Sequence, residues 1–139
     1  MKKTIICIDR DGTLSYDSKE HLFLGLDDDW LQKIEVLPGA VEGLKLLNTI
    51  PGVGIYMITN QGGVVISDFP LLTEERAHEV CRHVMEVLKN RGGLLNNYFL
   101  CPHATPEYAA RKPGVNFYPH LLHDCKCLKP ALGMVFDAL

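Results

Sequence analysis

Two aspartates in the order Asp9-x-Asp11 stand directly after an apolar, β-branched run at residues 4–8. Such a run is typical of a buried strand, and residues two apart in an extended chain project to the same side. Neighbouring carboxylates repel each other, and a hard divalent cation that prefers oxygen ligands relieves that repulsion. The pattern therefore predicts that Asp9 and Asp11 bind Mg²⁺. The alternative is a strand that ends in a solvated, Asp-rich turn.

A second polar cluster, Thr59-Asn60-Gln61-Gly62-Gly63, follows the apolar run at residues 53–58. A hydroxyl, an amide side chain and glycine backbone can surround an anion with hydrogen-bond donors. If the strands before the two clusters are adjacent, Thr59 lies level with Asp9. The alternative interpretation is a glycine-rich connection between a strand and a helix.

Three cysteines and a histidine stand at the two ends of a long polar segment: Cys101, His103, Cys125 and Cys127. Four such ligands match a closed, tetrahedral Zn²⁺ site, which is structural because a catalytic zinc keeps one position open for water. We expect the zinc to stabilise a loop, residues 101–127, that is too poor in apolar residues to fold alone. Buried thiols or one disulfide are the alternatives, and His120 or His123 is close enough in sequence to replace His103.

The segments around these clusters follow the alternating pattern of an α/β fold with a parallel sheet. Strands are predicted at residues 4–8, 53–58 and 98–100, and helices at 40–48 and 73–90, the second with Thr73 as its N-cap. Leu46 is predicted on the apolar face of the first helix. Residues 15–33 are expected to form a long loop or short hairpin, with the acidic triplet at 27–29 as a solvated turn.

Three motifs in this order resemble the haloacid dehalogenase (HAD) superfamily of phosphohydrolases: Asp9-x-Asp11-Gly12-Thr13-Leu14, Thr59-Asn60-Gln61 and Lys129-Pro130. The resemblance implies a Rossmann-like parallel sheet flanked by helices, without a large cap. It also implies that Asp9 is the nucleophile that becomes an aspartyl-phosphate, and that Asp11 is the general acid and base. Thr59, Asn60 and Lys129 are then expected to bind the substrate phosphate. Asp9 and the backbone carbonyl of Asp11 are expected to hold a catalytic Mg²⁺.

The whole arrangement of Cys-x-His, Cys-x-Cys and Lys-Pro-x-x-Gly-Met is similar to one branch of that superfamily, the heptose bisphosphate phosphatases and histidinol-phosphate phosphatases. The branch implies a small zinc-binding loop and a small phosphorylated metabolite as substrate, with a sugar bisphosphate fitting slightly better than histidinol phosphate. Members of the branch usually carry Arg where this chain has Leu128. We expect Arg111, in a loop longer than usual, to supply the missing cation.

The length of 139 residues predicts a single domain, 1–139, that contains the zinc-binding loop. The chain is expected to be incomplete at its C-terminus, since the family's fourth motif, an acidic Gly-Asp-x-x-x-Asp stretch, and the last one or two strands are missing from it. An uncovered sheet edge favours self-association. A second hypothesis is therefore a catalytically incomplete HAD-like module used for binding or assembly.

Charge and composition limit the remaining function classes. A net charge of −3 argues against a nucleic-acid surface, including a zinc-dependent one. No apolar stretch approaches the roughly 20 residues of a membrane span. The apolar region of the N-terminus is too short for a secretory signal, so we expect a cytoplasmic protein that does not bind membranes.

Overall fold

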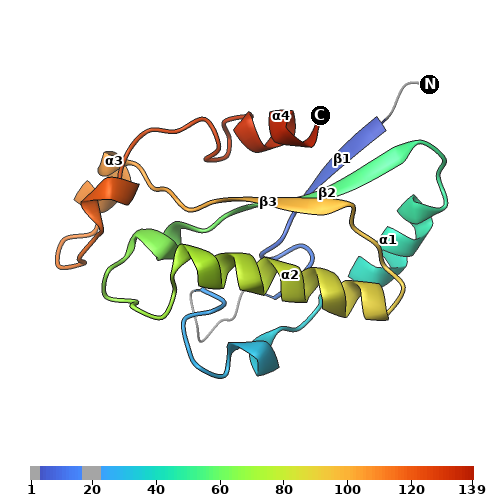
Figure 1. The fold of residues 1–139 in the computed structure, drawn as a ribbon, viewed down its shortest axis with the longest axis horizontal. Coiled ribbons are helices and arrows are strands. Elements are labelled where there is room, and N and C mark those ends of the chain that lie inside the picture. Colours follow the sequence, from blue (N-terminus) through green and yellow to red (C-terminus); the bar gives the residue numbers. More distant parts are fainter. Residues whose placement is uncertain (1–3, 17–22) are drawn as a thin grey trace.

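The computed structural model describes residues 4–16 and 23–139 and contains a three-stranded parallel sheet (Figure 1). The strands are β1 (Thr4–Asp9), β2 (Val53–Asn60) and β3 (Asn97–Cys101), in the spatial order β1-β2-β3. Both neighbouring pairs are parallel, with Asp9 in register with Ile58. The α/β class is confirmed, and β1 and β2 extend slightly beyond their predicted ends to include Asp9, Thr59 and Asn60.

Two helices, α1 (Ala40–Asn48) and α2 (Glu74–Asn90), cover one face of this sheet (Figure 1). Both helices were predicted within these bounds. The predicted N-cap of α2 is also present, because the Thr73 side chain accepts a hydrogen bond from the backbone N–H of Arg76 at 3.1 Å.

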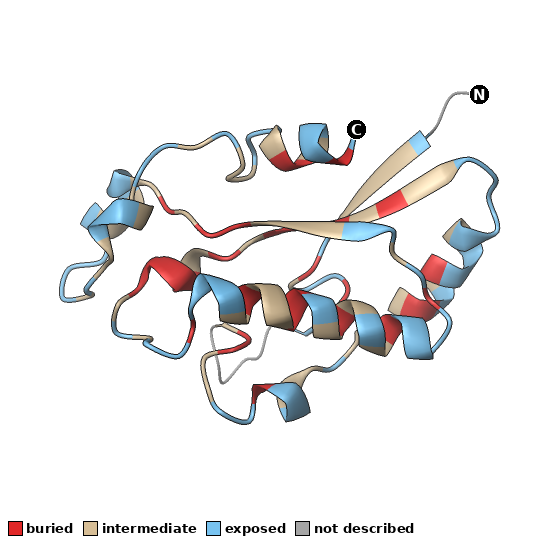
Figure 2. Ribbon diagram, viewed as in Figure 1, coloured by how far each residue is buried: buried red, intermediate tan, exposed pale blue. Residues whose placement is uncertain are grey.

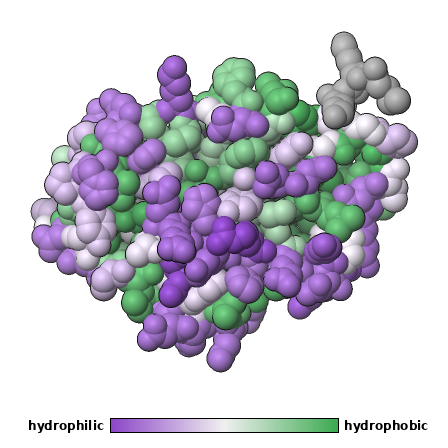
Figure 3. Space-filling model, in the orientation of Figure 1, coloured by the Kyte–Doolittle hydropathy of each residue, from purple (hydrophilic) through white to green (hydrophobic). Residues whose placement is uncertain are grey.

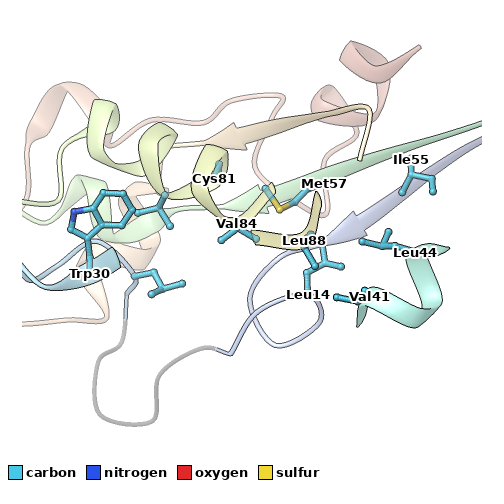
Figure 4. Packing of buried hydrophobic residues seen from close by; sticks show 11 residues of the cluster. Leu14, Trp30, Val41, Leu44, Ile55, Met57, Cys81, Val84 and Leu88 are labelled. Carbon is cyan, nitrogen blue, oxygen red and sulfur yellow. The ribbon is translucent and has the colours of Figure 1, made fainter. Parts of the chain in front are cut away.

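The main core lies between these two helices and the sheet (Figure 4). It contains Val41 and Leu44 of α1, Ile55 and Met57 of β2, and the stripe of α2 that repeats every three or four residues: Val80, Cys81, Val84 and Leu88. Figure 2 shows the same alternation of buried and exposed positions along α2. The prediction for Leu46 was wrong: it is 70% exposed, because it lies on the outer side of α1.

Among the described residues, the opposite face of the sheet carries only the short helix α4 (Gly133–Ala138) (Figure 1). Met134 of α4 is buried against Ile58 and Cys101, whereas Phe136 is 65% exposed. In Figure 3 apolar side chains gather at the top of the molecule, where α4 lies, and the side that carries α2 is mostly hydrophilic.

The segment between β3 and α4 is more structured than the sequence predicted. It includes α3 (Pro106–Ala110) and the 3-10 turn η3 (Pro119–Leu121). Its side chains Tyr108, Phe117, Leu121 and Leu122 pack on Val65 and Ile66, at the end of the 3-10 turn η2 (Gly62–Val65) and directly after it. The segment thus has apolar contacts, but they involve residues outside it, and the expectation that it does not fold alone stays a prediction.

The long connection after β1 was predicted at residues 15–33, and residues 17–22 of it lie outside the described part. The remainder contains the 3-10 turn η1 (Trp30–Lys33), and Trp30 is buried in the main core. In the acidic triplet, Asp27 and Asp29 both form ion pairs with Lys33.

Candidate active site

Asp9 is the last residue of β1, and its carboxylate is half exposed at the carboxyl end of the sheet. Its Oδ1 atom accepts two hydrogen bonds, from the backbone N–H of Arg10 at 2.9 Å and from Nζ of Lys129 at 2.7 Å. Within residues 4–16 and 23–139, no donor contacts Oδ2. One oxygen of Asp9 is thus held in place and the other is available to a ligand.

Asp11 is held by its neighbour in the sequence. Arg10 is fully buried, and its Nε and Nη2 atoms donate to the two carboxylate oxygens of Asp11 at 2.8 and 3.1 Å. Nη1 of Arg10 donates to the sulfur of Cys81 on α2 at 3.4 Å. Burial acts to lower the pKa of Arg10, but the charges and hydrogen bonds of Asp11 and Cys81 together raise that pKa, so the guanidinium remains charged.

Gln61 joins the two predicted clusters. Its Nε2 atom donates to Oδ2 of Asp11 at 3.0 Å and to Oγ1 of Thr59 at 2.7 Å. Thr59 and Gln61 are both buried, with about 1% and 2% of their surface exposed. The hydroxyl of Thr59 and the carboxylate of Asp11 are therefore tied together through one amide group.

Lys129 reaches this site from the far end of the chain. Its Nζ contacts Asp9 and also donates to the backbone carbonyl of Ile58 at 3.2 Å. Asn60 positions the backbone of Lys129: Oδ1 of Asn60 accepts from the Lys129 N–H at 2.9 Å, and Nδ2 donates to the Lys129 carbonyl at 3.2 Å. Both polar ends of the Asn60 amide are thus used to fix the segment that carries the lysine.

The structure brings together five of the predicted site residues: Asp9, Asp11, Thr59, Asn60 and Lys129. It places Arg111 elsewhere, exposed at the C-terminal end of α3, and no hydrogen bond or ion pair joins it to the described residues of the site. Leu128 packs against the small core beneath α4.

Two contributors were missed by reasoning from the sequence, Arg10 and Gln61. Both stand inside the quoted motifs. Its position in the sequence could have indicated the role of Arg10: it stands directly between a buried strand and Asp11, where a cation can pair with that carboxylate.

The predicted metal ligands also meet in space. Ligand atoms of Cys101, His103, Cys125 and Cys127 lie within 4.8 Å of one another. Their sulfur–sulfur distances are 2.9 to 3.5 Å, and Nδ1 of His103 lies 3.5 to 3.7 Å from two of the sulfurs. A tetrahedral zinc with Zn–S bonds of about 2.3 Å needs sulfurs about 3.8 Å apart, so the cluster fits zinc with small adjustments.

The surroundings of the cluster bear on the candidate histidines and the thiol states. The ring of His123 lies tilted against that of His103, with ring centroids 4.3 Å apart, and its Nδ1 contacts the backbone carbonyl of Asp124. Burial lowers the pKa of His103, with a further effect from His123, and so favours the neutral imidazole that binds metals. All five cysteines are free thiols, and burial raises the pKa of Cys101.

Comparison with solved structures identifies this fold. The heptose 1,7-bisphosphate phosphatase of B. bronchiseptica, solved with magnesium and phosphate, aligns over 97% of this chain and 61% of its own, with a TM-score of 0.65 and 24% identity. A HAD-like protein from Mesorhizobium loti aligns over 97% of this chain and 55% of its own, with a TM-score of 0.70 and 21% identity. The chain has the HAD-like phosphatase fold.

Sequence relatives of this HAD-like chain are of two kinds. The histidine biosynthesis bifunctional protein HisB of Campylobacter jejuni is 33% identical over 129 residues, which are 89% of this chain and 34% of HisB. The heptose-1,7-bisphosphate 7-phosphatase of Pseudomonas putida is 27% identical over 131 residues, 94% of this chain and 60% of that enzyme. The chain thus spans about a third of the first relative and three fifths of the second. No family model matches it.

The oxygen atoms of the site fit the cation of a HAD-like phosphatase. Arg10 and Gln61 occupy the side chain of Asp11, so the Asp9 carboxylate and the backbone carbonyl of Asp11 are the groups that fit Mg²⁺, a cation that usually binds only one or two carboxylates. Gly12 has φ of +79°, which turns the chain sharply after them. No helix in the described ranges is long and apolar enough to cross a membrane.

Proposed function

We propose that this chain carries the core of a Mg²⁺-dependent phosphomonoester hydrolase that acts through an aspartyl-phosphate. The observation that carries the proposal is the contact between Nζ of Lys129 and Oδ1 of Asp9 at 2.7 Å, across 120 residues of sequence. A cation next to a carboxylate nucleophile offsets the repulsion between that carboxylate and an anionic phosphate ester. The sheet, the two strand ends and the Asn60 contacts all serve to hold this pair together.

In the proposed reaction, Oδ2 of Asp9 attacks phosphorus in line, and the bond from phosphorus to the alkoxide leaving group breaks. Asp11, protonated once the substrate is bound, gives that proton to the alkoxide, and then accepts a proton from the water that hydrolyses the aspartyl-phosphate. Thr59 and Lys129 bind the phosphoryl oxygens. When bound by Asp9 and the carbonyl of Asp11, Mg²⁺ neutralises charge on those oxygens. Asn60 acts by holding Lys129.

The proposed substrate is a small phosphorylated metabolite of the cytoplasm, with a sugar bisphosphate such as a heptose bisphosphate as the leading candidate and histidinol phosphate as the alternative. The heptose bisphosphate appears in the names of relatives, whereas histidinol phosphate follows from the resemblance of the sequence motifs. Comparing kcat/KM for the two substrates in the presence of Mg²⁺ decides between them. Hydrolysis of neither substrate, nor of a generic aryl phosphate, would contradict the proposed enzyme.

Arg111 remains a candidate for a second phosphate contact, as a substitute for the arginine replaced by Leu128. Its exposed place at the end of α3 requires the substrate to reach that side of the molecule. An Arg111→Ala protein is expected to show a higher KM for a bisphosphate and an unchanged KM for a monophosphate. Equal KM values for wild type and variant on both substrates would remove Arg111 from the site.

A catalytically incomplete binding or assembly module is the second candidate function. Two observations favour it: Leu128 is apolar, and one edge of β1 has no partner strand among the residues described. In that case the chain binds inorganic phosphate with Mg²⁺ but releases none from an aryl phosphate. Both proposals include self-association through the β1 edge. Both also include a single domain with a loop in which zinc is a structural ion.

A further inference from the structure

We propose that Gln61 is a positioning residue of this site, which directs the hydroxyl hydrogen of Thr59 toward a phosphoryl oxygen. This inference rests on the proposed function. Its basis is the single amide nitrogen that lies 2.7 Å from Oγ1 of Thr59 and 3.0 Å from Oδ2 of Asp11. Gln61 itself need not touch the substrate, because it acts through these two side chains.

The charge of Arg10 fixes the orientation of the Gln61 amide. Arg10 donates to both oxygens of Asp11, and a carboxylate that receives such bonds accepts hydrogen bonds and donates none. The group that Gln61 turns toward Asp11 must therefore be its NH₂ end and not its carbonyl oxygen. The same NH₂ end faces Thr59, so Thr59 accepts that hydrogen bond through its oxygen.

Accepting this bond leaves the hydroxyl hydrogen of Thr59 for another partner. No acceptor for it lies within hydrogen-bond distance among residues 4–16 and 23–139. Thr59 is 1% exposed, and a buried donor without an acceptor is costly. A phosphoryl oxygen bound beside Asp9 satisfies this hydrogen, and Gln61 thus prepares Thr59 as a donor before the substrate arrives.

Substitutions at Gln61 can distinguish a residue that only stabilises the fold from one that orients the Thr59 hydroxyl. Gln61→Met keeps the length of the side chain and removes both hydrogen bonds. Gln61→Glu keeps the shape but replaces the donor with an acceptor, which draws the Thr59 hydrogen inward and places a negative charge beside Asp11. The matched control is Gln32→Met, which makes the same change at the only other glutamine, on the exposed side of η1.

The experiment measures the affinity of each protein for inorganic phosphate in the presence of Mg²⁺ by calorimetry, together with kcat and KM for an aryl phosphate. We expect Gln61→Met to bind phosphate about 10-fold more weakly, and Gln61→Glu about 100-fold more weakly, with Gln32→Met unchanged. In a Thr59→Val background, Gln61→Met should lower the affinity by less than about twofold, because the hydroxyl that it positions is gone.

Each outcome either supports or overturns the inference. A Gln61→Met protein that binds phosphate as wild type does, with the same thermal unfolding midpoint, overturns it, as does an equal effect of this change with and without the Thr59 hydroxyl. If Gln61→Met fails to fold, Gln61→Glu carries the test, and wild-type affinity in that protein is the overturning result. A wild-type chain that neither binds nor hydrolyses phosphate compounds overturns the proposed function, and this inference with it.

Discussion

Arg10 and Asp11 show how one residue can serve both stability and chemistry. A fully buried guanidinium has lost its hydration, and its charge needs a partner inside the protein. Asp11 supplies that partner through both of its oxygens, while Cys81 accepts a hydrogen bond from Nη1. The carboxylate proposed as the general acid and base therefore also holds the motif together.

This pairing predicts different effects for the two aspartates. Asp11→Asn leaves a buried Arg10 without its counter-charge and should lower the free energy of unfolding by about 3 kcal/mol. Asp9→Asn removes a half-exposed ion pair with Lys129 and should cost no more than about 1 kcal/mol. Both changes should abolish turnover. Urea unfolding curves measure the difference, and equal stabilities of the two variants would contradict the structural role of Asp11.

At the scale of elements, β2 and the chain before α4 are joined by the Asn60 amide. Its two hydrogen bonds to the backbone of Lys129 imitate one step of strand pairing between segments 69 residues apart. The same pattern occurs away from the site, where Asn48 at the end of α1 accepts from the N–H of Leu94 at 2.9 Å and donates to its carbonyl at 3.0 Å.

These two amides form a matched pair for a test of positioning. We expect Asn60→Ala to lower kcat/KM for an aryl phosphate by about 10-fold or more, because Lys129 loses its fixed place. Asn48→Ala removes two equivalent hydrogen bonds and should destabilise the fold by a similar amount, about 1–2 kcal/mol, without changing kcat/KM. Steady-state kinetics and thermal unfolding of both proteins separate the effects; equal kinetic losses would mean that Asn60 acts through stability alone.

The cluster of Cys101, His103, Cys125 and Cys127, which we expect to bind zinc, is connected to the same segment, since Cys127 lies two residues before Lys129. Removing zinc with a chelator, or replacing Cys127 with Ser, should loosen the chain from Cys125 to α4 and reduce turnover together with metal content. Cys7→Ser is the control, because Cys7 lies on the sheet outside the ligand cluster. Zinc is measured by atomic emission and loosening by limited proteolysis. Full activity in a zinc-free protein would show that the cluster does not support the site.

For the whole molecule, the open features among the described residues include the β1 edge of the sheet and the face under α4. Within the described ranges β1 pairs with β2 only, and the backbone N–H of Thr4 bonds to Gly52 on that side. Since N–H groups alternate along a strand, those of Ile5 and Cys7 point to the open edge. A strand edge of this kind can pair with another chain.

We expect the 139-residue chain to associate at concentrations of tens of micromolar or above, through this edge. Ile5→Lys places a charge beside the edge and should shift the chain toward the monomer, without loss of the core formed by α1 and α2. Sedimentation velocity over a range of concentrations measures this, with Leu46→Lys on the exposed side of α1 as the control. A wild-type chain that stays monomeric throughout would contradict the prediction.

Most of the fold could be predicted from sequence patterns that reflect local interactions. Short sequence patterns predicted the apolar stripe of α2, its Thr73 cap and the buried strands. The placement of Thr59 and Asp9 at neighbouring strand ends followed from parallel pairing. Arg10 and Gln61 did not follow, because their roles depend on which way a side chain turns after the strand ends. The apolar cluster of Phe117 and Leu122 was missed because its partners, Val65 and Ile66, are about 50 residues away.

The contact between Asp9 and Lys129 also bears on how the protein acquires its site during folding. It closes a loop of 120 residues, whereas β1, α1 and β2 can assemble from neighbouring parts of the chain. Loops of that length are slow to close, so the ammonium group arrives after the sheet has formed. During synthesis, a ribosome-bound chain that has released only its first 100 residues carries Asp9 without Lys129, its partner in the folded protein. Competence for phosphate is therefore gained near the end of folding.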